Sequence, residues 1–172
     1  ERYPLASLAR TLFASMKCYP GFRVDRGAGS RGPSEISPVP VLQPGGENLA
    51  SVLHELLTRI DFGESAAEVR EFLWSAYPWV EEIAAETSRA APGTVAVSLR
   101  EQGMTHSMSG WDLSDGMLRF LCLEAALLNP NPPPLVAVDE PEVGLHPRLL
   151  PIVGDIIKTG AERTQVLVTT HS

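Results

Sequence analysis

The sequence lacks the long hydrophobic runs, paired cysteines and excess basic charge that mark several common classes of protein. No apolar run approaches the ~20 residues that a bilayer-spanning helix requires, which excludes a membrane helix. The two cysteines, Cys18 and Cys122, are too few for a disulfide framework or a zinc site. Both stand among apolar neighbours, so we expect two buried thiols in a reducing cytoplasm. With 14 basic against 21 acidic residues the net charge is −7, which excludes a globally basic nucleic-acid-binding surface but not a local patch.

The chain does contain enough material for one domain or for one lobe of a larger domain. Its 172 residues are 44% hydrophobic, and a chain of this length buries about two-thirds of its unfolded surface. It opens on Glu1-Arg2-Tyr3-Pro4, which is neither a signal peptide nor a start methionine, and stops just after a strand-like run. Natural domains seldom end on a buried strand, because its edge and its following turn would be missing. We therefore expect the chain to be part of a longer protein.

Hydrophobic periodicity and turn residues predict alternating helices and strands. We expect helices over 4–17, 49–61, 65–76, 79–87, 117–128 and roughly 147–160, and strands over 18–24, 94–101, 104–109, 135–138 and 166–170. The segment 26–46, rich in Gly, Pro and Ser, is expected to be a loop. The order strand, helix, strand from residue 135 to residue 170 predicts a βαβ unit and therefore a parallel sheet.

Two acids follow an apolar strand at 135–138, which reads LVAV and is expected to be buried on both faces. Asp139 and Glu140 would then lie at the carboxyl edge of a parallel sheet, where such sheets bind ligands. There Asp139 could hold Mg²⁺ and Glu140 could polarise an attacking water. The alternative is that the strand simply ends in polar residues.

Two further stretches could contact phosphate. Ser114 precedes a predicted helix and can cap it, while Gly116 lets backbone N–H groups approach an anion at the positive end of the helix dipole. An ordinary helix cap is the alternative. His171 follows the second apolar strand, so it is expected at the same sheet edge as the two acids, as a ligand of phosphate or as a structural histidine.

Taken in order, three segments resemble the head of an ATP-binding-cassette (ABC) ATPase. Residues 113–117 (LSDGM) are similar to its signature motif, 135–140 (LVAVDE) to its Walker B strand, and 166–171 (VLVTTH) to its switch-histidine strand. The continuation DEPEVGLHP over 139–147 resembles the soluble AAA-type ATPases related to RecF, SMC and OLD proteins rather than transporter subunits. Arg119 also fits the soluble families, or is an ordinary surface arginine.

This resemblance implies an α/β fold with the P-loop NTPase core of ABC type, mainly a parallel sheet and only partly present, with a helical insertion. Residues 1–46 would be a partial core segment with a Gly/Pro-rich loop, 47–93 the helical insertion, and 94–172 the signature, Walker B and switch-histidine part. The implied activity is hydrolysis of ATP to ADP and phosphate with Mg²⁺ in the cytoplasm. The implied partners are ATP, a second copy in a nucleotide-sandwich homodimer, and DNA or a phage-defence partner, with no membrane.

The resemblance also implies roles for individual residues. Asp139 would be the metal ligand, Glu140 the general base, and His171 the sensor of the γ-phosphate. The nucleotide-binding residues would be Ser114, Asp115 and Gly116, acting on the ATP of the partner subunit.

The phosphate-cradling Walker A loop is not apparent in the sequence. The best candidate, 27–34 (GAGSRGPS), has Pro33 in place of the required lysine and no helix after it. We therefore expect Walker A to lie elsewhere in a longer protein and this chain alone to be inactive. The arginines at 23, 26 and 31 could touch phosphate or nucleic acid, or belong to a solvated loop. A non-catalytic regulatory module and a transporter's nucleotide-binding subunit remain as alternative functions.

Overall fold

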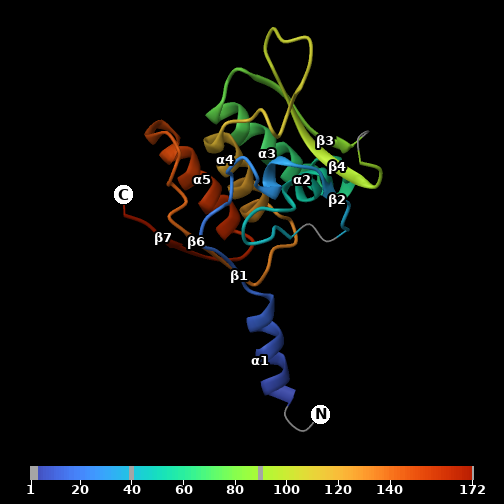
Figure 1. The fold of residues 1–172 in the computed structure, drawn as a ribbon. Coiled ribbons are helices and arrows are strands. Elements are labelled where there is room, and N and C mark those ends of the chain that lie inside the picture. The colour runs from blue at the N-terminus through green and yellow to red at the C-terminus, as the bar shows by residue number, and fades with distance from the viewer. Residues whose placement is uncertain (1–3, 39–40, 89–90, 172) are drawn as a thin grey trace.

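The computed structural model describes residues 4–38, 41–88 and 91–171. These residues contain a three-stranded parallel sheet and a four-stranded antiparallel sheet (Figure 1). The parallel sheet has the order β1 (Lys17–Tyr19), β6 (Leu135–Asp139), β7 (Gln165–Thr169). A short 3₁₀ turn, η3 (Pro147–Leu149), and helix α5 (Leu150–Ala161) connect β6 to β7. The predicted βαβ unit is therefore confirmed.

The two faces of the parallel sheet differ in exposure. Val136 and Val138 are fully buried in the core, whereas on the opposite face Cys18, Ala137 and Leu167 lie side by side in register. On that face Cys18 is exposed and the Leu167 side chain is 58% exposed. The expectation of burial on both faces, and of a buried Cys18, is wrong because the described helices cover only one face. Cys122 is buried as expected.

The second sheet is antiparallel and contains β2 (Ser34–Glu35), β4 (Thr94–Glu101) and β3 (Val80–Thr87), with β5 (Met108–Ser109) also pairing with β4. The hairpin expected between 94–101 and 104–109 forms as β4 and β5. The helix expected over 79–87 is wrong, since these residues form β3. A register shift between Val80 and Glu82 breaks the alternation, so Val80 and Ile83 share a buried face although three positions separate them. That three-residue spacing resembles a helical period in the sequence.

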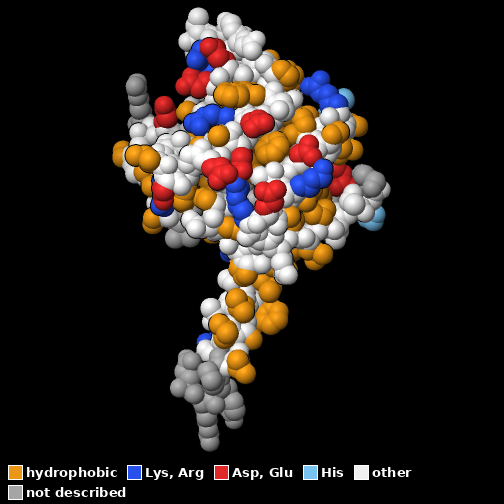
Figure 2. Space-filling model, turned by 180° about the vertical axis from the view of Figure 1, so that it is seen from behind, with side chains coloured by type: hydrophobic (Ala, Val, Ile, Leu, Met, Phe, Trp, Pro, Cys, Tyr) orange, Lys and Arg blue, Asp and Glu red, His pale blue; other side chains and the backbone are white. Residues whose placement is uncertain are grey.

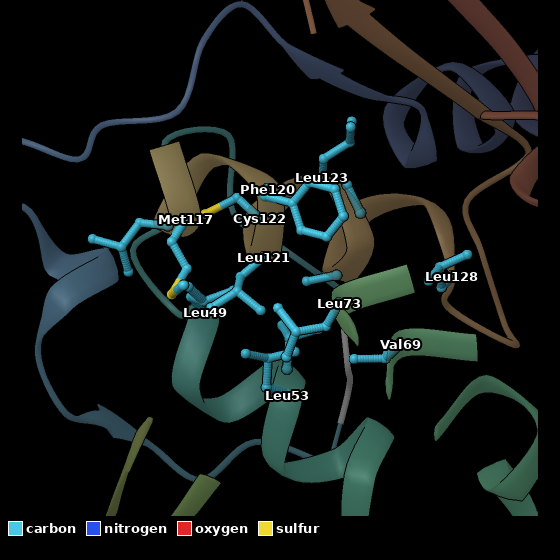
Figure 3. Packing of buried hydrophobic residues seen from close by; sticks show 14 of the residues in the cluster. Leu49, Leu53, Val69, Leu73, Met117, Phe120, Leu121, Cys122, Leu123 and Leu128 are labelled. Atoms are coloured by element: carbon cyan, nitrogen blue, oxygen red, sulfur yellow. The ribbon is translucent and has the colours of Figure 1, made fainter. Parts of the chain in front are cut away.

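Three helices meet in the core: α2 (Leu49–Thr58), α3 (Gly63–Ala76) and α4 (Asp115–Leu127), with a 3₁₀ turn, η2 (Ile60–Phe62), between the first two. Figure 3 shows apolar side chains of all three helices meeting in one cluster, among them Leu49 and Leu53 from α2, Leu73 from α3 and Leu121 from α4. Every residue of α4 from Phe120 to Leu127 is buried. The assignment of 47–93 as a helical insertion stays a prediction. The described residues of this segment form α2, η2, α3 and β3.

Between β1 and α2, the described residues form the 3₁₀ turn η1 (Gly29–Arg31) and the short strand β2, and the rest of them are irregular. The strand expected over 18–24 ends at Tyr19 because Pro20 has no N–H with which to continue the ladder. Phe22, Val24 and Leu42 are buried against the core. A Cβ atom at Gly46, which has φ +86°, would lie 2.8 Å from Cys122 Sγ. The segment between β1 and α2 therefore packs against α4 at Gly46.

Helix α1 (Pro4–Ser15) forms as expected but stands away from the body of the molecule (Figure 1). Its apolar side chains form a visible stripe in Figure 2, and those of Leu5 and Phe13 are 81% and 71% exposed. Within the described residues, no helix has both the length and the apolar character to cross a bilayer.

Candidate active site

The two acids and the histidine singled out from the sequence lie together at the carboxyl edge of the parallel sheet. Asp139 is the last residue of β6 and pairs with Thr169, the last residue of β7. The Thr169 hydroxyl donates a hydrogen bond to Asp139 Oδ1. His171 Nε2 lies 3.1 Å from Glu140 Oε1. We call Asp139, Glu140, Thr169 and His171 the rim site.

Glu140 leaves the strand with an unusual backbone conformation. Its φ of 46° is in the left-handed region, which costs about 1 kcal/mol or more for a residue with a Cβ. Its N–H donates to the Thr169 carbonyl at 3.0 Å and lies 3.3 Å from Thr169 Oγ1. Thr169 thus bonds both to the Asp139 carboxylate and to the Glu140 backbone. The turn at Glu140 brings its side chain to His171, which follows β7.

The rim site is open to solvent on its outer side. The side chain of His171 is 89% exposed and that of Glu140 is 37% exposed. Glu142 fixes the segment after β7, because its Oε1 accepts hydrogen bonds from the Thr170 hydroxyl and from the His171 N–H, the latter at 3.3 Å. The Glu140 carboxylate and the His171 imidazole are therefore in contact at a place that a ligand can reach from solvent.

The predicted helix cap is present at the start of α4. Ser114 Oγ accepts a hydrogen bond of 3.2 Å from the Met117 N–H. Asp115, the first helical residue, forms an ion pair with Arg31. Gly116 faces the loop after β6, and a Cβ at this position would lie 3.2 Å from the Gly144 carbonyl oxygen. We call residues 110–116, which lead into and begin α4, the signature turn.

The same loop also touches Arg119, one turn further along α4. A Cβ at Gly144, which has φ +78°, would lie 2.9 Å from Arg119 Nε. Arg119, Asp139 and Glu140 line the same hollow as residues 19–22. Arg119 is therefore part of the surroundings of the rim site, and the start of α4 lies against the loop that carries Glu140.

Arg31 is buried and does not belong to a solvated loop. It is 7% exposed, and its Nε donates to the Val24 carbonyl at 2.9 Å and to the Asp25 carbonyl at 3.2 Å. Ser30, beside it, donates to the Arg23 carbonyl at 2.6 Å. The polar groups of the glycine-rich stretch 27–34 are thus directed inward, where they organise the protein around α4.

Three buried groups on α4 or in contact with it, Cys122, Tyr77 and Glu124, have strongly shifted pKa values. Burial raises the pKa of the Cys122 thiol, and burial together with the Glu124 charge raises the pKa of Tyr77 to about 12. Glu124, fully buried on α4, has its pKa raised well above the usual value by desolvation, and neither carboxyl oxygen has a hydrogen-bond partner among the described residues. Desolvation therefore favours the neutral form of this carboxyl group, which is part of the helix that begins at the signature turn.

The fold resembles that of a known class of ATPase head. The chain is similar to the SMC head in the crystal structure of the SMC head bound to the C-winged helix domain of ScpA. The TM-score is 0.53 at 15% identity, over 80% of this chain and 44% of that one. The α/β fold of this chain thus resembles that of the SMC head, and the chain spans less than half of the matched chain's length.

The sequence also matches a family. Residues 30–172 match the family described as "AAA domain, putative AbiEii toxin, Type IV TA system", and the chain belongs to this family of AAA domains. A search of curated proteins found no match.

Sequence reasoning missed three residues that shape the site. In the sequence, Thr169 is only part of a strand motif and Glu142 only part of a loop pattern, and Arg31 is expected to contact phosphate or nucleic acid or to belong to a solvated loop. The signal for Thr169 is its place two residues before His171, at the end of the apolar run 166–168. The hydrogen bonds of Arg31 join it to residues about 80 positions away, so the sequence around Arg31 does not indicate them.

Proposed function

We propose that this chain supplies the signature, Walker B and switch-histidine elements of an ATP-hydrolysing enzyme that closes as a dimer around nucleotide. The observation that carries the proposal is the 3.1 Å contact between His171 Nε2 and Glu140 Oε1 beside Asp139. These three side chains come from two strand ends that lie next to each other in a parallel sheet. The carboxyl edge of such a sheet is where α/β proteins bind their ligands.

Each residue of the rim site has a separate task in this proposal. Glu140 accepts a proton from the attacking water, and His171 orients that water and contacts the γ-phosphate. The contact with His171 holds the Glu140 carboxylate on the solvent side of the turn. Thr169 fixes Asp139 and the Glu140 backbone, so the pair keeps its geometry when substrate binds.

The donor chemistry of the rim site fits Mg²⁺. Asp139 presents a carboxylate at the exposed end of β6, and Mg²⁺ prefers oxygen ligands, usually one or two carboxylates together with waters and phosphate oxygens. When bound, Mg²⁺ would offset the negative charge of the β- and γ-phosphates.

The signature turn would act on the nucleotide of the partner subunit. Ser114 and the N–H of Gly116 stand at the N-terminus of a 13-residue helix, where the dipole favours an anion. We propose that the Walker A loop lies outside residues 1–172 and that these residues alone turn over no ATP. We also propose a role in DNA maintenance or phage defence, supported by the toxin–antitoxin description of the family.

The Glu140→Gln variant of the full-length protein tests this function. Loss of the general base should lower ATP hydrolysis by about 10²- to 10⁴-fold while ATP binding persists, since the amide keeps the size of the side chain. Asp155→Asn, which breaks only the exposed pair with Lys158 on α5, is the matched control and should hydrolyse ATP normally.

Unchanged turnover in Glu140→Gln would refute the general-base role. A wild-type protein that binds ATP without hydrolysing it would favour a regulatory module, and co-purification with a membrane subunit would favour a transporter.

A further inference from the structure

The buried guanidinium of Arg31 connects the η1 turn to the signature turn. On the η1 side it donates to two carbonyls of residues 24 and 25. On the other side Nη1 donates to the Leu113 carbonyl at 2.7 Å and lies 3.4 Å from that of Trp111 and 3.5 Å from that of Gly110. Nη2 is bonded to Asp115 Oδ1. Arg31 therefore reaches the whole turn that presents Ser114.

The packing between the two turns is close enough to require glycine. A Cβ at Gly110 would lie 2.4 Å from the Arg31 carbonyl oxygen, and a Cβ at Gly32 would lie 3.1 Å from Trp111 Cζ2. The Gly110 N–H also donates to the Val97 carbonyl of β4 at 3.1 Å. The position of the signature turn is thus determined by η1 and β4 as well as by α4.

A buried charge needs a partner, and Asp115 is the carboxylate that forms the ion pair with Arg31 among the described residues. The Arg31 side chain is 6% exposed, whereas that of Asp115 is 68% exposed. The arginine therefore contacts Asp115 from the protein side, while the carboxylate stands at the surface beside Ser114. An unpaired carboxylate at this place would repel an approaching triphosphate.

We propose that Arg31 is a positioning residue of the ATP site, which fixes the signature turn and neutralises Asp115 so that the turn accepts the partner's γ-phosphate. This inference rests on the proposed function. It assigns Asp115 to the Arg31 pair, so the phosphate contacts fall to Ser114 and the Gly116 amide.

Two effects of Arg31 can be separated by a double-mutant cycle. Arg31→Met removes both the hydrogen bonds to the carbonyls and the charge opposite Asp115. Asp115→Asn in the same protein removes the uncompensated carboxylate but restores none of the carbonyl bonds. If the double variant regained nucleotide-driven dimerisation but not stability, the regained dimerisation would measure the effect of neutralising Asp115, separately from the hydrogen bonds.

The experiment uses the full-length protein carrying Glu140→Gln, which keeps bound ATP intact, and measures the ATP concentration for half-maximal dimerisation together with Tm. We expect Arg31→Met to raise that concentration by about 10- to 100-fold, and the added Asp115→Asn to restore about 5-fold or more of it while Tm stays low. Arg163→Met is the matched control, because it breaks a bidentate pair with Glu68 between α5 and α3. It should lower Tm without weakening dimerisation.

Three results would overturn the proposal or its basis. If adding Asp115→Asn restored no dimerisation, the role of Arg31 would be refuted while the proposed function stood. The same would hold if Arg31→Met dimerised like the wild type. Failure of the parent protein to dimerise with ATP would refute the proposed function and this inference with it.

If Arg31→Met does not fold, Arg31→Lys replaces it, since the ammonium keeps the charge but not the planar fork. It should lower Tm yet dimerise within about 3-fold of the parent, because the electrostatic part is retained. A weakening of about 10-fold or more, which is about 1.4 kcal/mol, would contradict the proposal.

Discussion

The rim site and the signature turn bind the same kind of ligand in this account, but they are built in opposite ways. The rim site is open, with His171 89% exposed, and it is positioned by one threonine and by backbone bonds at two strand ends. The signature turn is supported from within by a buried arginine and by glycines that allow close backbone packing. Changes at the rim should therefore affect chemistry with little loss of stability, and changes at the turn should affect both.

Gly110→Ala should have the largest effect on stability. The added Cβ would lie 2.4 Å from a backbone oxygen, so the η1 turn and the signature turn must separate. We expect the free energy of unfolding to fall by about 3 kcal/mol, at the upper end for an overpacked site, as measured by urea denaturation.

Gly154→Ala is the matched control for this change. Gly154 lies inside α5, and a Cβ there meets nothing within 4 Å. It should stabilise the protein by about 0.5–1 kcal/mol. Equal unfolding energies for the two variants would show that the turn is not as tightly supported as its contacts imply.

Glu124→Met should stabilise the helix behind the signature turn in a pH-dependent way. Burial raises the pKa of Glu124 in the folded state, so the unfolded chain loses its proton at lower pH than the folded protein does. Stability is therefore fully present below the unfolded pKa and falls as pH rises towards the folded pKa. Methionine removes this dependence, and we expect a gain of about 1–3 kcal/mol at pH 8 and little gain near pH 4.

Thermal unfolding at several pH values measures this effect. Glu71→Gln, at an exposed position on α3, should leave the pH profile as in the wild type. If Glu124→Met raised the stability by the same amount at pH 4 and pH 8, the ionisation of Glu124 would be excluded as the cause of the gain.

Thr169→Val tests the rim site with the smallest expected change in stability. Valine keeps the strand and its backbone bonds but removes the hydroxyl that donates to Asp139. We expect ATP hydrolysis by the full-length protein to fall about 10-fold, as for a residue that orients a ligand, while the free energy of unfolding changes by less than about 1 kcal/mol. A variant that unfolds more easily by more than about 2 kcal/mol, yet hydrolyses ATP normally, would reverse the comparison between the two regions.

The rim site was predictable because its determinants are local in the sequence. An apolar strand that ends in Asp139-Glu140, and another that ends shortly before His171, must bring these residues to one edge once the βαβ unit forms. The Ser114 cap was predictable for the same reason, since its bond to Met117 spans three residues.

The support of the signature turn was not predictable, because it depends on contacts between distant segments. Arg31 and Leu113 are 82 positions apart, and nothing near Arg31 marks it as buried. The helix expected over 79–87 failed for a similar reason: the bulge at Val80 and the pairing with β4 determine which face of β3 is buried.

The most direct measurement is ATP hydrolysis by mixed dimers of two inactive full-length variants, Glu140→Gln and Ser114→Arg. If each nucleotide is bound by the rim of one subunit and the signature turn of the other, a mixed dimer contains one intact site. An equal mixture should then recover about one quarter of the wild-type rate, since half the dimers are mixed and each has one of two sites. A mixture as inactive as either variant alone would contradict a site shared between two copies of the chain.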